Sequence, residues 1–357
     1  MTVRAWRAVG VAALLAAAWA AVVAASAHAP RPAPRVLIVC NRNSADSLAI
    51  ARHYAAARRI PSDHRYALDL PSAERCSTED YLRRLRQPLL ARLRRTGLDV
   101  DYIVATKGVP LRVEGGRYDG LSVDGLIATM RMGELPPRSV SPYFGKRRHF
   151  GRRRYGFYLV TRLDGYTRAD CLRLVDRSMA ARRAKGPFLL HLGPGHENDG
   201  YRLVNAAMRR AHAQLEARGF AAVLSPGPEF AGSERPLMGY FSWGSNDAGY
   251  NREVYRSLRF VPGALAETAV STSGRTFSNP DDPGQSLIAD LVAQGVTGCK
   301  GYVTEPYVAS IALPDILFGR YTRGYNLAES FAMASRYLRW KDVVIGDPLC
   351  APYAHAR

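Results

Sequence analysis

The chain has 357 residues, and its 50 lysines and arginines against 31 aspartates and glutamates give a formal net charge of +19. A hydrophobic share of 47% allows a sizeable core and excludes a disordered or collagen-like chain. A chain with this much core does not need a disulfide framework, although one bridge through Cys76 or Cys350 stays open. Cys40 and Cys299 lie in apolar runs and are predicted to be buried.

The first 29 residues have the features of a signal peptide. Two arginines precede an apolar run over residues 9–25, and Ala-His-Ala at 27–29 gives a small-x-small cleavage pattern. We expect cleavage there, a short leader over residues 30–35, and export to the periplasm or the cell exterior. A retained membrane anchor is the alternative, but the apolar run is short for a span of about 20 residues.

Strands and helices alternate along the mature chain. Before residue 107 the pattern predicts two helices beginning at Ser44 and Ser77, and strands at 36–41, 65–70 and 100–106. Residues 107–155 are irregular, with one short helix at 122–130. A strand at 157–161 and an amphipathic helix at 167–185 follow. This βαβ order predicts a parallel sheet with right-handed crossovers.

After Pro187 the alternation starts again. It predicts helices at 201–218, 285–294 and 326–339, and strands at 188–192, 221–224, 237–243, 265–271, 298–304 and 343–345. The expected fold is α/β, with two adjoining, mainly parallel sheets flanked by helices. Its parts are an N-terminal subdomain over 36–165, a linking helix over 166–186 and a second subdomain over 187–357.

Two apolar runs of the second half end in small polar residues. They are LMGYFSWGSNDAG at 237–249 and ALAETAVSTSGRTF at 264–277. In an open α/β sheet the ligand site lies just outside the carboxyl ends of the parallel strands. The sequence therefore predicts a binding or catalytic site at these two strand ends.

Both strand ends resemble those of gingipain-type cysteine peptidases of the caspase-like superfamily. In that family the first strand ends in Tyr-x-Gly-His-Gly and the second in a cysteine followed by small residues. Here the matching positions read YFSWG at 240–244 and STSG at 271–274. The resemblance therefore places Trp243 at the position of the catalytic histidine and Ser271 at that of the nucleophile.

Weaker likenesses keep the same order along nearly the whole mature chain. They are DYIV and VP at 101–104 and 109–110, VTRLDG with a threonine at 160–167, and GDPL at 346–349. They imply that the second subdomain is caspase-like. The phrases SWGSND, GQSLIADL and WKDVVIGDPLCAPY also resemble a group of exported bacterial proteins that has no assigned activity.

The two replaced positions change the expected chemistry. An indole cannot accept a proton, and a serine hydroxyl is a poor nucleophile without a base. We therefore do not expect gingipain-like proteolysis, and favour a protein that binds a peptide or a glycan in the former active-site cleft. The alternative is a hydrolase with altered catalytic residues, built on Ser271 and His196 or on the carboxylates of Asp247 and Glu305.

Several polar residues near the strand ends are candidates for this site. His196 follows a strand that lies beside the third strand in a caspase-like sheet, and Glu197 or Asp199 would orient it against Ser271. Acidic residues at strand ends bind metals or act as acid–base pairs, but they also form turns. The identity of any metal stays open. The candidate binding residues are Trp243, Ser245, Ser273, Tyr307, Asp281 and Asp282.

The segment Lys146–Arg154, KRRHFGRRR, places six cations among nine residues. It predicts attraction to anionic surfaces such as membrane lipid or acidic polysaccharide, and the alternative is a mobile solvated loop. Neither a nucleic-acid motif nor a GxGxxG pattern is present, so specific nucleic-acid binding and a nucleotide cofactor are not expected.

Overall fold

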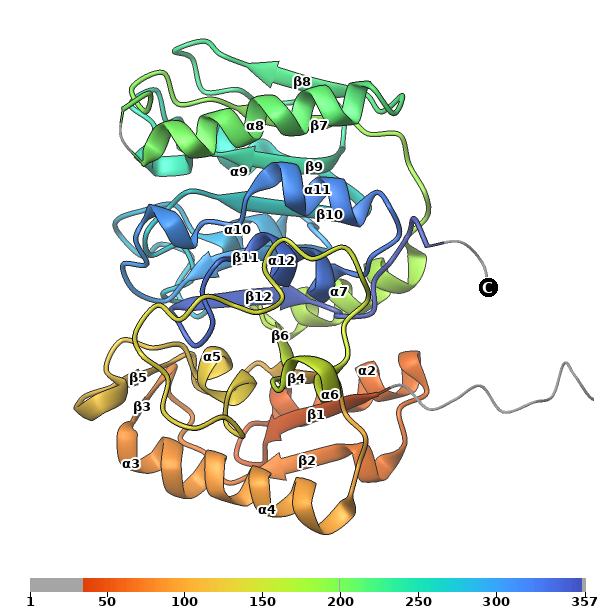
Figure 1. The fold of residues 1–357 in the computed structure, drawn as a ribbon, viewed down its shortest axis with the longest axis vertical. Coiled ribbons are helices and arrows are strands. Elements are labelled where there is room, and N and C mark those ends of the chain that lie inside the picture. The colour runs from red at the N-terminus through yellow and green to blue at the C-terminus, as the bar shows by residue number, and fades with distance from the viewer. Residues whose placement is uncertain (1–34, 199, 355–357) are drawn as a thin grey trace, which may run out of the picture. The chain divides into compact units, whose positions relative to one another are not determined.

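The computed structural model describes residues 35–198 and 200–354, so the predicted signal peptide and most of the leader lie outside the described residues. Ten strands form one sheet (Figure 1). Their order is β2 (Arg65–Leu68), β1 (Val36–Asn41), β4 (Tyr102–Thr106), β6 (Leu159–Leu163), β12 (Asp342–Gly346), β11 (Gly298–Tyr302), β10 (Phe260–Thr268), β9 (Leu237–Ser242), β7 (Phe188–His191) and β8 (Ala222–Ser225).

The sheet is mainly parallel, which confirms the predicted fold class. Strands β2, β1, β4 and β6 pair in parallel, and so do β8, β7, β9, β10 and β11. Strand β12 runs antiparallel to β11 and reaches β6 through the pair Ile345–Arg162. The two predicted sheets are thus joined edge to edge into one sheet by β12. The predicted division at residues 166–186 stays a prediction.

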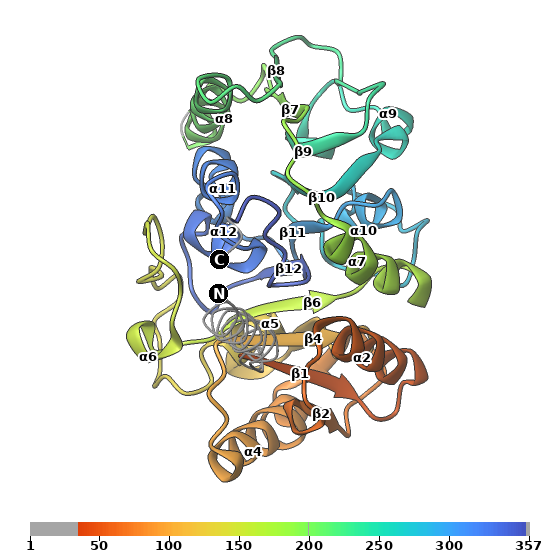
Figure 2. The ribbon, with the colours of Figure 1, turned by 90° about the vertical axis from the view of Figure 1, so that its right-hand side faces the viewer.

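Helices cover both faces of the sheet (Figure 2). One face carries α2 (Ala45–Arg58), α7 (Arg168–Ala180), α9 (Arg252–Ser257) and α10 (Ile288–Ala293). The other carries α4 (Gln87–Thr96), α5 (Val123–Ala128), α8 (Tyr201–Glu216), α11 (Pro314–Tyr321) and α12 (Leu327–Ala334). Shorter elements are α3 (Thr78–Asp80), α6 (Arg152–Tyr155) and a small parallel sheet of β3 (Arg75–Ser77) and β5 (Arg112–Glu114).

Polar side chains fix where the helices begin. The hydroxyl of Ser44 accepts a hydrogen bond from the backbone N–H of Ser47, as predicted for the start of α2. Capping boxes open α7 at Thr167 and α12 at Asn326, where a side chain three residues later bonds back to the cap. The sequence did not predict α9 or α11, because both are short and lie in segments rich in turn-forming residues.

Strand β10 and helix α12 end earlier than predicted. Strand β10 ends at Thr268, so Ser271 lies in a turn beyond the strand and not on it. Helix α12 ends at Ala334, well before Arg339, which has a positive φ of 53°. Both differences arise because local turn geometry overrides an apolar pattern that continues past the element.

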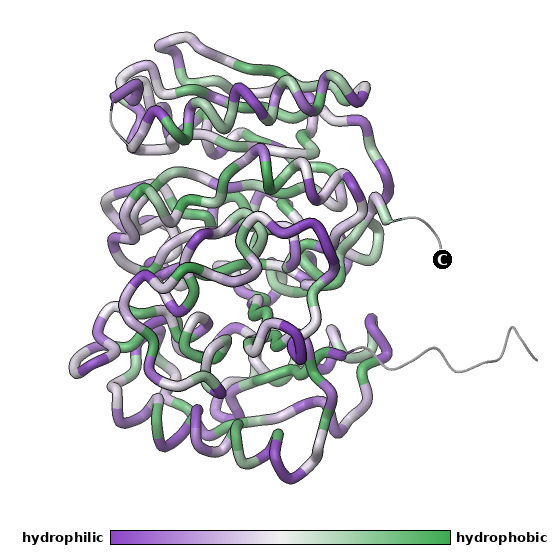
Figure 3. Tube along the Cα trace, in the orientation of Figure 1, coloured by the Kyte–Doolittle hydropathy of each residue, from purple (hydrophilic) through white to green (hydrophobic). Residues whose placement is uncertain are grey.

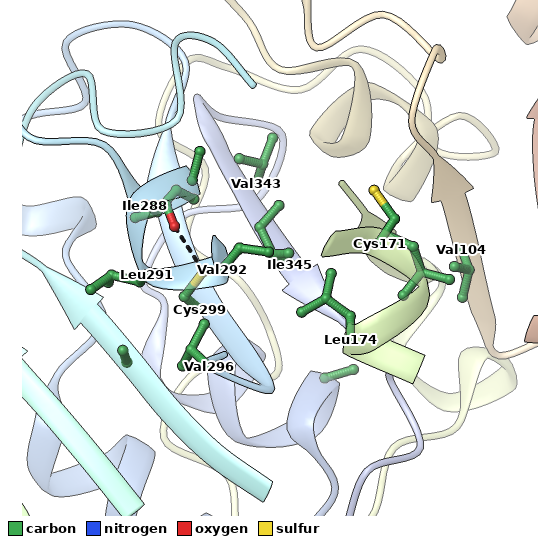
Figure 4. Packing of buried hydrophobic residues seen from close by; sticks show 14 of the residues in the cluster. Val104, Cys171, Leu174, Ile288, Leu291, Val292, Val296, Cys299, Val343 and Ile345 are labelled. Atoms are coloured by element: carbon green, nitrogen blue, oxygen red, sulfur yellow. Dashed lines mark hydrogen bonds between the residues drawn. The ribbon is translucent and has the colours of Figure 1, made fainter. Parts of the chain in front are cut away.

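The core lies between the sheet and its two helical layers. Figure 3 shows apolar residues concentrated on the strands, while α4 and α8 alternate between apolar and polar positions. In Figure 4, Cys299 lies beside Ile288 and Ile345, and Cys171 lies near Val104. All five cysteines are buried and free, which confirms the burial predicted for Cys40 and Cys299. Among the described helices, none combines the length and the apolar character that a membrane span requires.

Candidate functional site

A cavity of about 200 Å³ lies at the carboxyl ends of β9, β10 and β11. Among the predicted site residues, Trp243, Ser271, Glu305 and Tyr307 line it. They come from three separate loops, which meet because the strands before them are adjacent in the sheet. Tyr201, Asn246, Ala269, Pro306, Val308 and Ile311 complete the wall. The cavity therefore combines aromatic faces with hydroxyl, amide and carboxylate groups.

Trp243 forms a fixed wall of the cavity, being only 1% exposed. Its Nε1 donates to Oδ1 of Asn205 at 2.8 Å, and Asn205 in turn donates to the carbonyl of Gly193 and to Glu197. Asn205 lies on α8, so it joins this helix to the loops after β7 and β9. The sequence did not point to Asn205, because a single amide on a helix carries no distinctive pattern.

His196 stacks on Trp243, with ring centroids 4.0 Å apart and planes inclined by 28°. A Cβ at Gly193 would lie 2.5 Å from the His196 ring and 2.6 Å from Trp243, so only glycine allows this stack beside the strand end. His196 Nε2 lies 2.8 Å from the carbonyl oxygen of Asn246, which can only accept, so Nε2 carries the proton. Nδ1 is then the nitrogen able to act as a base.

Ser271 lies in the turn that follows β10. The amide of Asn246 donates to the carbonyl of Ala269 at 2.7 Å, and Gln285 bonds both Asn246 and Thr272. These contacts fix the turn against the loop after β9. The structure thus brings Ser271 and Trp243 to one cavity. His196 stacks on Trp243 but does not line the cavity. Asp199, a predicted orienter, is outside the described residues.

The loop 305–307 is the most unusual part of the wall. Tyr307 has φ 66° and ψ 148°, a conformation that a bulky residue rarely adopts and that costs about 1–3 kcal/mol. The Glu305 carboxylate accepts from the backbone N–H of Tyr307 at 3.0 Å, which holds the loop in this shape. Tyr307 as a whole residue is 54% exposed, so the strained backbone holds an aromatic residue at the surface.

Asp247 lies on the other side of the strand ends and does not line the cavity. Its Oδ2 lies 3.3 Å from Nε2 of His191, and both side chains are buried. Burial lowers the pKa of His191, and the charge of Asp247 opposes this. Sequence analysis treated His191 as structural, and this pair could be found only from the adjacency of β7 and β9.

The remaining predicted residues also lie outside the cavity wall. Ser245 accepts a hydrogen bond from the backbone of Ser286, and Ser273 is buried with its hydroxyl unpaired. Asp282 pairs with Arg275, and Asp281 is an exposed turn residue. Within the described ranges, no group of three His, Cys, Asp or Glu side chains is arranged to hold a metal ion. The roles assigned to these residues stay predictions.

A buried charged network lies beneath the cavity. Glu267 of β10 and Lys300 of β11 are register partners, and neither is exposed. The Glu267 carboxylate accepts from the Tyr302 hydroxyl at 2.6 Å and from the backbone N–H of Ala312 at 2.9 Å, while Lys300 donates to the carbonyl of Ser310. The network anchors the loop that follows Tyr307. In the sequence, this network is marked only by a single acid and a single base, each inside an apolar run that is predicted to be a strand.

The basic segment Lys146–Arg154 is exposed but anchored. Phe150 is buried among Tyr143, Tyr155 and Phe157, and the Tyr143 hydroxyl donates to the carbonyl of Arg148. Arg152 donates to the carbonyl of Val100 and is mostly covered. The side chains of Arg147, Arg148 and Arg153 are exposed. The segment is therefore a fixed surface of cations.

The fold is similar to the folds of two solved structures. The chain is similar to the Arg-specific cysteine proteinase gingipain R, with a TM-score of 0.51, 10% sequence identity, and coverage of 90% of this chain and 79% of that one. A second structure, described as a protease, gives a TM-score of 0.51 at 11% identity and the same coverage. At this identity the likeness confirms the gingipain- and caspase-like fold and no more. No family model and no curated protein matches the chain.

Proposed function

We propose that this protein is exported, that it is not a cysteine peptidase, and that it binds a peptide or a glycan in the cavity walled by Trp243, Ser271 and Tyr307. The observation that supports this proposal is the lining of the cavity. Its aromatic and polar lining suits a ligand with flat apolar faces and hydrogen-bonding edges. Trp243 stands where the resemblance to gingipains places the catalytic histidine, and a tryptophan cannot act as a base.

The cysteines support the absence of thiol chemistry. A catalytic cysteine must be accessible and must readily form a thiolate. All five are buried, and none lines the cavity. Burial raises the pKa of Cys76 to about 12 and that of Cys350 to about 11. These thiols behave as structural residues.

One observation favours the hydrolase alternative. His196 packs against Trp243 behind the cavity that Ser271 lines, and its Nδ1 is the nitrogen free to accept a proton. A serine hydrolase would need this ring to turn toward the serine hydroxyl.

A blocking variant tests the proposal. Ser271→Trp should fill the cavity and weaken binding of a peptide or glycan selected from a broad array by about tenfold or more. Ser257→Trp, at the end of α9 on the opposite face of the sheet, is the matched control. Equal binding by both variants would contradict the proposal. Labelling by a fluorophosphonate that Ser271→Ala abolishes would instead establish the hydrolase.

The exposed cations of the basic segment suggest a second binding surface, separate from the cavity. We propose that Arg147, Arg148 and Arg153 attract anionic surfaces without sequence specificity. Replacing all three with glutamine should remove most of the retention on anionic vesicles and leave the unfolding midpoint nearly unchanged. Because charge attraction is screened over about 8 Å at physiological salt, retention should also fall steeply with salt. Unchanged retention would assign the attraction to arginines elsewhere on the surface.

A further inference from the structure

A second cavity, of about 300 Å³, lies behind the loop 305–307. Its wall comes from three segments that are distant in the sequence: residues 117–121, residues 134–137 and residues 339–341. Tyr118 and Trp340 supply aromatic surface. Arg117, Arg339 and Lys341 supply cations, and Asp119 and Glu134 supply carboxylates. The sequence analysis assigned no role to these residues, because no motif links them.

The two cavities share a wall. Trp340 Nε1 donates to the carbonyl of Pro306 at 2.8 Å, and Lys341 Nζ donates to the carbonyl of Glu305 at 2.9 Å. The rings of Tyr307 and Trp340 stack with centroids 6.4 Å apart and planes inclined by 18°. Residues of the second cavity therefore hold the loop that bounds the first, and aromatic surface continues from one to the other.

Cations lie over these aromatic faces. The Arg117 guanidinium is 4.6 Å from the Tyr118 ring centroid, Lys341 Nζ is 5.0 Å from that of Trp340, and Arg138 is 5.4 Å from that of Tyr307. Arg117 is 57% exposed, and its contact with Glu134 is a surface ion pair worth little. Among the described residues, Glu305 is the only charged one that lines the first cavity. The second cavity is lined by three cations and two carboxylates, so its lining has a net positive charge.

The position of the cavities narrows the ligand class. Strands β9, β10 and β11 are paired on both sides, so no free strand edge at the first cavity can extend by pairing with a peptide. Recognition there depends on side chains: aromatic faces with polar groups beside them. A sugar ring matches this arrangement, because its C–H faces are apolar and its hydroxyl groups point outward.

We propose that the two cavities are successive subsites of one cleft for an acidic glycan chain, with a carboxylate-bearing ring in the second cavity beside Arg117 and Arg138. This inference rests on the proposed function and names its ligand class. Tyr118 and Trp340 are only 7% and 8% exposed, so they form the apolar wall against which the ring packs. The two exposed guanidiniums pair with its carboxylate. A chain that fills both subsites gains affinity because the second contact is intramolecular.

The probes are oligosaccharides of uronic acid, from dimers to octamers, with neutral xylan oligosaccharides and oligoglutamate peptides of equal length. Calorimetry on the mature protein should show affinity for uronates that rises with length and then levels off. The double variant Arg117→Gln/Arg138→Gln should weaken binding of the longer uronates by about tenfold and leave the shortest nearly unchanged.

A charge-matched control separates this site from general attraction to a basic protein. Arg94→Gln/Arg95→Gln also removes two exposed cations, in the last turn of α4, and it should change uronate affinity by much less than the cavity variant. Equal losses in both double variants would overturn the inference, as would tighter binding of oligoglutamate or of neutral xylan oligosaccharides.

Ser271→Trp distinguishes this inference from the proposed function. If it abolishes binding while the Arg117 and Arg138 variant binds normally, the first cavity remains the binding site and the two-subsite inference fails. If it has no effect while the arginine variant loses affinity, the proposed function fails and, with it, the single cleft. If both variants lose affinity for uronates and the affinity of the wild type rises with uronate length, the proposed function and the two-subsite inference are both supported.

Discussion

Replacing Asp347 with alanine is expected to lower the free energy of unfolding by about 3–5 kcal/mol. The carboxylate is fully buried and accepts from the Tyr54 hydroxyl at 2.7 Å, from Arg58 Nε at 2.7 Å and from the Ser178 hydroxyl at 2.6 Å. These partners lie on α2 and α7, so the end of β12 is bound to both helices. No other carboxylate among the described residues forms an ion pair with the partly buried Arg58, so Asp347→Ala would leave its charge unpaired.

Denaturant unfolding followed by circular dichroism would measure this change. Asp176→Ala is the matched control, because Asp176 pairs with His53 across the same two helices at the surface. Its loss should cost less than about 1 kcal/mol. Asp347→Asn should fall between the two, since it keeps the shape and loses the charge. A loss at Asp347 no larger than at Asp176 would contradict the anchoring role.

Glu267 should make the protein less stable as the pH rises from 4.5 to above 7. Burial raises the pKa of Glu267 to about 7, and Lys300, the Tyr302 hydroxyl and the Ala312 N–H oppose this rise. Asp342 adds a smaller upward effect. A carboxyl with a higher pKa when folded binds its proton more tightly in the folded state. Its contribution, about 3 kcal/mol, is therefore complete below the unfolded pKa and is lost as the pH passes through about 7.

Comparing the wild type with Glu267→Gln isolates this group from all others that titrate. Glutamine keeps an acceptor for Tyr302 and Ala312 but does not ionise, so the difference in unfolding free energy should change by about 3 kcal/mol between pH 4.5 and 8. Glu79→Gln, at an exposed pair with Arg83, should show a flat difference. Parallel curves for the wild type and Glu267→Gln would mean that Glu267 does not titrate in this range.

Periodicity and turn signals were sufficient to predict most of the fold. The apolar run 36–41 and the capping serine at 44 correspond closely to β1 and α2. The joining of the two halves was not predictable, because β12 is short and its pairing with both β11 and β6 depends on contacts between distant segments. Local sequence patterns likewise do not predict which strands lie next to each other in the sheet.

The candidate site was predictable only in part, for a similar reason. The strand-end rule identified Trp243 and Ser271, which line one cavity. It could not separate the two faces of the sheet, and Asp247 turns to the face opposite the cavity to meet His191. Asn205, Trp340 and Lys341 come from a helix and from a loop whose positions depend on the completed fold.

The place of β12 also sets an order for folding. This strand lies between β6 and β11, yet it follows both of them in the sequence and is synthesised after them. Until residues 342–346 are in place, the inner edges of both halves are unpaired, and unpaired strand edges promote association between chains. A chain shortened before residue 342 would keep these edges open. Its aggregation during synthesis is then a consequence of topology, and not of weak local structure.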